Sequence, residues 1–210
     1  MNGLNLSGLG SKEVSTPSLT SLSLRKGMSL DLTKNSNLKR IRAGLGWRAG
    51  NGVAFDLDVT AISLNQNGIV NDAQDVVFYN QLNPMRGIQS LGDNKYGALT
   101  NSGLEEDNET ILADLDEIPE SVKEVLFVVT IHEAVERKQN FGMVKNAYIR
   151  IVDEDTNEEI CRYNMTENFS MQTACEIAKL SRTEKGWVFT ALGRGTNEDL
   201  MRVLIRYGVR

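Results

Sequence analysis

Closely spaced carboxylates are the feature of this chain most suggestive of chemistry. In the run FDLDVTAISL, Asp56, Asp58 and Thr60 alternate with apolar residues. Alternate side chains of a strand point to opposite faces, so the two carboxylates would lie about 7 Å apart on one face. Like charges at that spacing repel each other unless a cation or a base lies between them. The alternation therefore favours either a cation site or a solvated strand face.

A second group of oxygen-bearing side chains occupies the glycine-punctuated run SLGDNKYGALTNSGLEEDNET. Its acidic and amide members are Asp93, Asn94, Glu105, Glu106, Asp107, Asn108 and Glu109. Calcium takes roughly six to eight oxygen ligands from carboxylates, amide carbonyls and backbone carbonyls, and this run offers all three, whereas magnesium demands a stricter octahedron. The spacing does not match an EF-hand. The alternatives are a calcium-binding loop and a disordered acidic loop.

Side chains suited to catalysis are scarce. The single histidine, His132, excludes a multi-histidine zinc site, and its neighbour Glu133 would point to the opposite face of a strand. Cys161 and Cys175 lack metal-binding spacing, so we expect free thiols of a reducing compartment, with one disulfide as the alternative. No phosphate-binding loop or nucleophile elbow is found in the sequence. We therefore expect a protein that is not an enzyme.

Composition and charge narrow the class of partner. The chain has 210 residues and a formal net charge of −5, which argues against a nucleic-acid partner and favours cations. It contains no apolar run near the roughly 20 residues that span a bilayer. Residues 1–20 lack the basic start and apolar centre of a signal peptide. We expect a cytoplasmic protein without a transmembrane segment.

Short apolar alternations between turn residues predict a protein dominated by β-structure, a β-sandwich. The expected strands cover residues 22–24, 30–32, 41–47, 53–64, 76–79, 122–132, a hairpin at 146–165, and 187–193. The similar runs SLSLRKG and SLDLTKN suit adjacent strands. Residues 1–20 are rich in Gly, Ser and Asn and are expected to form a tail or linker, which leaves 21–210 as one domain.

Two short peripheral helices are expected near the C-terminus. Thr173 and Glu176 have the spacing of a capping box, and the apolar stripe of that helix would be Ala174, Ile177 and Ala178. Asn197 is the expected N-cap of the second helix. Its stripe consists of Leu200, Val203, Leu204 and Tyr207, with Gly208 as the stop.

A series of short motifs, taken in order, resembles the tellurium-resistance TerD family over residues 21–210. They are GLGW (44–47), FDLDVTA (55–61), VFYN (77–80), GDN (92–94), EEDNE (105–109), FGMVKNAYIRIV (141–152), RYNM (162–165) and WxFxAxGxG (187–195). The resemblance implies a β-sandwich that binds calcium and serves tolerance of tellurite and other stresses. It also implies protein partners in a larger, membrane-linked complex.

The resemblance also implies a set of calcium ligands. They are Asp56, Asp58, Asp93, Asn94, Asp107, Asn108 and Glu109, with Glu133 in place of a frequent family aspartate. Asn108 stands where the family carries a second aspartate, so we expect a lower calcium affinity or one site fewer. The expected role of the ion is structural, because it would order a surface that a partner reads. The alternative function is a structural or assembly component, for example of a phage particle, built on the same fold.

Overall fold

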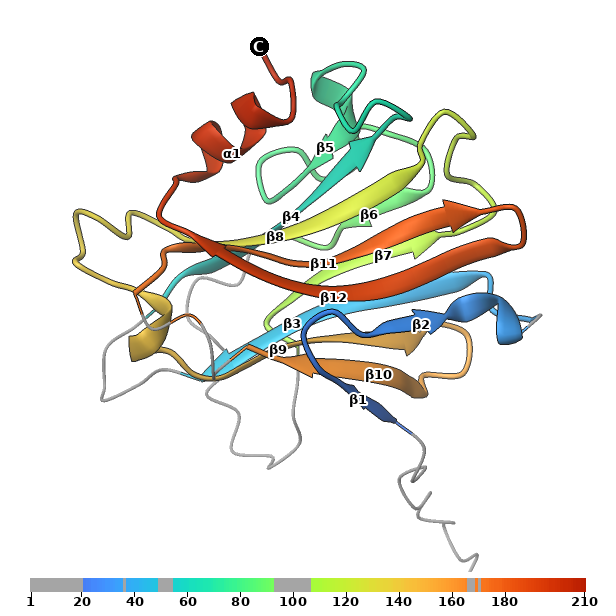
Figure 1. Ribbon diagram of the computed structural model, residues 1–210, viewed down its shortest axis with the longest axis horizontal. Coiled ribbons are helices and arrows are strands. Elements are labelled where there is room, and N and C mark those ends of the chain that lie inside the picture. Colours follow the sequence, from blue (N-terminus) through green and yellow to red (C-terminus); the bar gives the residue numbers. More distant parts are fainter. Residues whose placement is uncertain (1–20, 36, 49–54, 93–106, 166–168, 170) are drawn as a thin grey trace, which may run out of the picture.

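The protein is a sandwich of two six-stranded sheets that pack face to face (Figure 1). The computed structural model describes residues 21–35, 37–48, 55–92, 107–165, 169 and 171–210. Sheet A consists, from edge to edge, of β1 (Leu22–Leu24), β10 (Glu159–Asn164), β9 (Lys145–Asp153), β3 (Arg40–Arg48), β7 (Glu109–Asp114) and β6 (Ile88–Ser90). Sheet B consists of β2 (Ser29–Asp31), β12 (Gly186–Thr196), β11 (Ala174–Thr183), β8 (Glu124–Ile131), β4 (Leu57–Leu64) and β5 (Val76–Val77). The predicted sandwich is confirmed.

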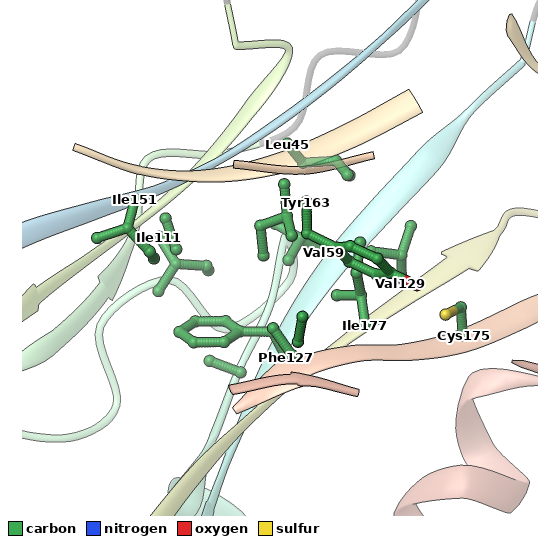
Figure 2. Packing of buried hydrophobic residues seen from close by; sticks show 14 of the residues in the cluster. Leu45, Val59, Ile111, Phe127, Val129, Ile151, Tyr163, Cys175 and Ile177 are labelled. Carbon is green, nitrogen blue, oxygen red and sulfur yellow. The ribbon is translucent and has the colours of Figure 1, made fainter. Parts of the chain in front are cut away.

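The core lies between the two sheets and follows from the alternation of each strand. Leu57, Val59 and Ala61 of β4 point into it, whereas Ile62 belongs to a second apolar cluster on the outer face of sheet B. Figure 2 shows side chains from both sheets packed against each other, among them Leu45, Val59, Ile111, Phe127, Ile151 and Ile177. β4 is therefore buried on both faces, which explains why it is almost free of charge.

The helix expected after Thr173 is wrong, because those residues form β11. A register shift between Glu176 and Ala178 marks a β-bulge in this strand. Ile177 lies in the bulge, between Glu176 and Ala178, and Cys175, Ile177 and Ala178 all belong to the main core. An extra residue in one strand puts two neighbouring residues on the same side. Ile177 and Ala178 therefore both face the core, and with Ala174, which is also buried, they form an i, i+3, i+4 pattern that imitates the period of a helix.

The second expected helix is present as α1 (Leu200–Arg206), with a different cap. Asp199, not Asn197, is the N-cap, and its side chain accepts a hydrogen bond from the backbone N–H of Arg202 at 2.8 Å. Val203 and Leu204 pack on the outer face of sheet B. The other helical segments of the described residues are single 3₁₀ turns at Leu32–Lys34, Ala73–Asp75 and Phe141–Met143. None of the described helices is long and apolar enough to cross a membrane.

The first two strands belong to different sheets, so the expectation that they are neighbours is wrong. β1 pairs in parallel with β10 of sheet A, and β2 pairs antiparallel with β12 of sheet B. The chain crosses between the sheets in a tight turn in which Gly27 has φ +82 and donates to the carbonyl of Ala191 at 2.7 Å. The start of the domain therefore closes one edge of each sheet.

Cys161 and Cys175 are free thiols, and both are fully buried in the core. Burial raises the pKa of each thiol to about 12. Since the thiolate is the reactive form, we expect neither cysteine to react with an aromatic disulfide reagent in the native protein, and both to react in denaturant. The absorbance of the aromatic thiolate released from the reagent measures how many cysteines react in the native protein and how many react in denaturant. Rapid modification of a native thiol would contradict the described burial.

Candidate metal site

A buried carboxylate joins the two sheets at the point where β4 and β7 begin. Glu109, the first residue of β7, is 4% exposed, and its Oε2 accepts a hydrogen bond from the backbone N–H of Val59 in β4 at 2.6 Å. β5 pairs with β4 only at Ala61 and Ile62. The edge of β4 at Val59 therefore has no pairing with β5, and a side chain can reach its backbone. Glu109 of sheet A thus occupies a ladder position of sheet B.

Asp56 lies directly before β4 and shares this end of the sandwich. Its carbonyl accepts a hydrogen bond from the backbone N–H of His132 at 2.9 Å, and its carboxylate oxygen Oδ1 is buried. Asp56 and Glu109 therefore supply two carboxylates near the starts of β4 and β7. Both are hard oxygen donors of the kind that calcium prefers.

Asn108 is also buried at this end, but its carbonyl oxygen already has a partner. Oδ1 accepts a hydrogen bond from the backbone N–H of Trp47 at 2.8 Å, and the Asn108 backbone N–H donates to Leu45 at 2.7 Å. Its side-chain nitrogen Nδ2 is buried without a hydrogen-bond partner among the described residues. Asn108 thus holds the start of β7 against β3, and only the second lone pair of its oxygen remains for another donor or an ion.

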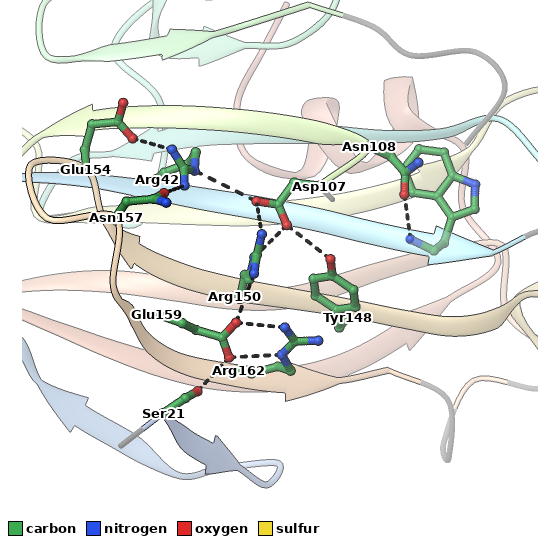
Figure 3. A network of polar contacts seen from close by, with 11 residues as sticks. Ser21, Arg42, Asp107, Asn108, Tyr148, Arg150, Glu154, Asn157, Glu159 and Arg162 are labelled. Carbon is green, nitrogen blue, oxygen red and sulfur yellow. Dashed lines mark hydrogen bonds and ion pairs between the residues drawn. The ribbon is translucent and has the colours of Figure 1, made fainter. Parts of the chain in front are cut away.

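Asp107 is directed elsewhere, onto the outer face of sheet A (Figure 3). Its carboxylate accepts hydrogen bonds from Arg150 at 2.7 and 3.1 Å and from the Tyr148 hydroxyl at 3.3 Å. Arg42 lies 3.9 Å away, and the Asp107 side chain is only 7% exposed. Two arginines therefore already neutralise this carboxylate, which the structure does not bring together with Glu109.

The remaining predicted ligands are also separated. Asp58 is 5% exposed and lies opposite Thr130 in the β4–β8 ladder, on the outer face of sheet B. Glu133 is exposed and pairs with Arg137 at 3.3 Å. Asp93 and Asn94 lie outside the described residues. The described residues hold no group of three His, Cys, Asp or Glu side chains fit for a metal ion, so a calcium site built on Asp56 and Glu109 needs oxygens from the rest of the chain.

Sequence reasoning missed the arginine network around Asp107. Arg150 and Arg162 lie directly opposite each other in the β9–β10 ladder, and Glu159 accepts hydrogen bonds from both, at 3.1 and 2.7 Å (Figure 3). The Arg162 guanidinium also lies 4.1 Å from the centroid of the Tyr148 ring. Like charges opposite each other destabilise a sheet, and the bridging carboxylate offsets that repulsion. The signal in the sequence was the alternation of Tyr148 and Arg150 with the apolar Ile149 and Ile151 in β9.

The Glu159 carboxyl should make stability depend on pH. Burial raises its pKa, but hydrogen bonds from Arg162, Ser21 and Arg150 outweigh burial and lower the pKa from 4.5 to about 2. A lowered folded-state pKa means that this stabilisation is complete above the unfolded pKa and is lost as the pH falls toward the folded pKa. Between about pH 6 and about pH 3, the protein should lose about 2 kcal/mol more than Glu159→Gln.

Urea unfolding of both proteins at the two pH values measures this difference. The Glu159→Gln side chain cannot be protonated, so its own curve reports every other titrating group and serves as the control. Equal losses for the two proteins would show that the arginines and Ser21 do not hold the Glu159 carboxylate in its charged form.

A second buried carboxylate fixes α1 to sheet B. Glu176 of β11 is 4% exposed and accepts hydrogen bonds from Arg206 at 2.5 Å and from the Tyr207 hydroxyl at 2.7 Å. Burial and the hydrogen bond to Glu176 raise the pKa of Tyr207 to about 12. Glu176, which suggested a capping box in the sequence, therefore holds the C-terminal helix against sheet B through these two hydrogen bonds.

Solved structures share this architecture. The crystal structure of a homologue of the telluride resistance protein TerD from Streptomyces coelicolor A3(2) superposes with a TM-score of 0.63 at 21% identity, covering 80% of this chain and 96% of that chain. A second crystal structure, of a protein of unknown function, gives a TM-score of 0.61 at 17% identity and covers 80% of this chain. At these identities the likeness establishes the fold alone: a two-sheet sandwich of the kind seen in a TerD homologue.

The sequence itself settles the family. Residues 20–207 match the TerD domain. General stress protein 16U of Bacillus subtilis (strain 168) is 41% identical over 194 residues, which cover 90% of this chain and 98% of the relative. Tellurium resistance protein TerD of Serratia marcescens is 39% identical over 193 residues, with 90% and 98% covered. The chain belongs to the TerD family, as the motif resemblance predicted.

Proposed function

We propose that this chain is a calcium-binding protein of stress or tellurite resistance, which acts as a metal-ordered interaction module in a larger complex. The names of its relatives, a general stress protein and a tellurium resistance protein, support the stress role. We also propose a binding role rather than a catalytic one, and a cytoplasmic location, which suits two free and buried thiols.

The buried carboxylate of Glu109 carries the calcium part of the proposal. Carboxylate oxygens are hard donors of the kind that calcium binds. Glu109 is 4% exposed and sits between the sheets, with Asp56 near the start of β4. A calcium ion bound to both would join sheet A to sheet B. The predicted ligands Asp93 and Asn94 would add hard oxygens, and the ion would thereby order the acidic run that contains them.

Calcium should therefore raise the melting temperature of the protein. At a calcium concentration of about 100 times the dissociation constant, binding to the folded state adds about 2.7 kcal/mol. Asp56→Asn combined with Glu109→Gln should remove this calcium-dependent rise. Asp107→Asn should keep it, because that carboxylate faces arginines. The comparison is between calcium and chelator for each protein, so any loss of intrinsic stability cancels.

Calorimetric titration with calcium and with magnesium completes the test. A heat of binding with calcium, absent in the double variant, supports the site at the starts of β4 and β7. Equal melting curves in calcium and in chelator would reject calcium binding. An equal response to magnesium would reject calcium selectivity, and loss of the rise in Asp107→Asn alone would move the site to the outer face of sheet A.

A further inference from the structure

A cavity of about 420 Å³ opens on the outer face of sheet B. The sheet contributes Asp58 and Thr130, which are partners across the β4–β8 ladder. The turn that follows β8, the segment that leads into α1 and the first residues of α1 supply most of the rest of the lining. Figure 1 shows this turn, in yellow, and the start of α1, in red, at the same end of sheet B. We call this cavity the acidic pocket.

The pocket carries a strong negative charge. Its lining contains five carboxylates against Arg202 and His132. Some of them have partners within the protein: Asp199 caps α1, Glu198 pairs with Arg206 at 2.6 Å, and the exposed Glu133 pairs with Arg137 at 3.3 Å. Glu136 is exposed and forms no ion pair with any residue that the structure describes. A hollow lined by one sign of charge concentrates ligands of the opposite sign.

Two apolar side chains of the same lining lie in solvent. Val135, in the turn after β8, is 77% exposed, and Met201, in the first turn of α1, is 60% exposed. Lysine and arginine combine an apolar stem with a charged head. The acidic lining and the apolar side chains thus complement a basic side chain that is flanked by apolar residues.

The arrangement does not suit a metal ion. Calcium needs roughly six to eight oxygens at about 2.3–2.6 Å from one point. The carboxylates of the pocket form no group of three that could hold a metal ion, as is true of all the residues described. The volume is instead within the range of roughly 300–1,000 Å³ that organic ligands occupy. The matching ligand is therefore larger than an ion.

We propose that the acidic pocket binds a lysine or arginine side chain, presented by a segment of a partner protein with apolar residues on either side. Glu133 and Glu136, with Asp58 behind them, receive the cationic head. Val135 and Met201 contact the flanking apolar residues. This inference rests on the proposed role as an interaction module and names the chemistry of its partner. It does not require calcium.

A capped model peptide of alternating lysine and leucine is the probe. It is titrated into the full chain in the presence of chelator, with fluorescence anisotropy for affinity and amide chemical shifts for location. We expect a dissociation constant below about 1 mM, weakened when salt rises from about 0.05 M to about 0.5 M. The shifts should concentrate in the turn after β8 and the first turn of α1. A peptide with glutamine in place of lysine should not bind.

Charge variants test the location of the binding energy. Glu133→Gln with Glu136→Gln removes two exposed carboxylates of the pocket and should weaken the peptide about fivefold. Glu120→Gln with Glu184→Gln makes the same change of net charge at exposed positions outside the pocket lining. This matched control should bind like the parent. Equal weakening in both double variants would show that long-range attraction to the net charge, and not the pocket, holds the peptide, and the proposal would be rejected.

Apolar variants test the kind of partner. Val135→Ser with Met201→Ser replaces exposed side chains, so folding should be intact, and the lysine–leucine peptide should bind less tightly. If a lysine–serine peptide or a polyamine binds as tightly as the lysine–leucine peptide, the pocket recognises a bare cation and the proposal of a protein segment fails. Loss of peptide binding with calcium binding intact rejects only the pocket; the reverse result rejects only the calcium site.

Discussion

Replacement of Asp107 by asparagine is expected to lower the free energy of unfolding by about 3 kcal/mol. Asp107 is 7% exposed and Arg150 is 17% exposed, so their ion pair is largely removed from water. Asparagine keeps the shape but removes the charge, and leaves Arg150 and Arg42 facing each other without it. The substitution leaves buried arginines without their carboxylate partner. The resulting loss of stability is larger than the net stabilisation that the ion pair itself contributes.

Denaturant unfolding in chelator measures this loss, and Asp155→Asn provides a matched control. Asp155 also pairs with an arginine of β3, Arg40, but the two side chains are 43% and 54% exposed. Exposed pairs of this kind contribute about 0–1 kcal/mol. Similar losses in the two variants would show that burial of Asp107 does not matter. A loss for Asp107→Asn that appears only with calcium would assign this carboxylate to the ion.

Gly46→Ala is expected to cost about 3 kcal/mol through overpacking. Gly46 lies opposite Tyr148 in the β3–β9 ladder, and an added Cβ would overlap the Tyr148 ring. The ring cannot simply turn away, because Arg162 lies over it with its guanidinium carbon 4.1 Å from the centroid. Gly46 is not among the glycines with positive φ, so the cost comes from the ring rather than from backbone strain. Chemical denaturation measures the change.

A double-mutant cycle separates this contact from other effects of the substitution. In a Tyr148→Ala background the space beside Gly46 is empty, so the added methyl group should cost less than about 1 kcal/mol, and the two changes should be strongly non-additive. Additive losses would mean that Gly46 is required for some other reason. Gly44, the other glycine of the motif GLGW, is restricted by a different neighbour: an added Cβ there would overlap the Asp107 carboxylate.

The strands that are buried on both faces were the easiest to predict. β8 is nearly continuous in apolar residues and β4 carries Asp58 as its single charge, because each strand is covered by the other sheet on one side and by further side chains on the other. β11 could not be predicted by periodicity, since its bulge places Ile177 and Ala178 in one core and so imitates a helix. The placement of β1 and β2 in different sheets depends on the turn at Gly27 and on distant partners, which similar local patterns do not distinguish.

The acidic residues of the site were predictable by type but not by direction. Asp107 and Glu109 both flank Asn108 in one short run, yet Asp107 faces the arginines of sheet A while Glu109 reaches the backbone of β4. Direction depends on which neighbour offers a donor, and those donors come from residues far away in the chain. Arg150 and Arg162 resembled ordinary solvated charges for the same reason.

The pairing of the first strands with the last ones has a consequence for biosynthesis. Ser29 of β2 contacts Thr190 of β12 through their hydroxyl groups, 161 positions along the chain. A ribosome adds about 5–20 residues per second, so the N-terminal strands emerge many seconds before their partners exist. Neither sheet can close that edge during translation. The domain must complete its fold after nearly the whole chain has been released, and until then its opening strands remain open to chaperones.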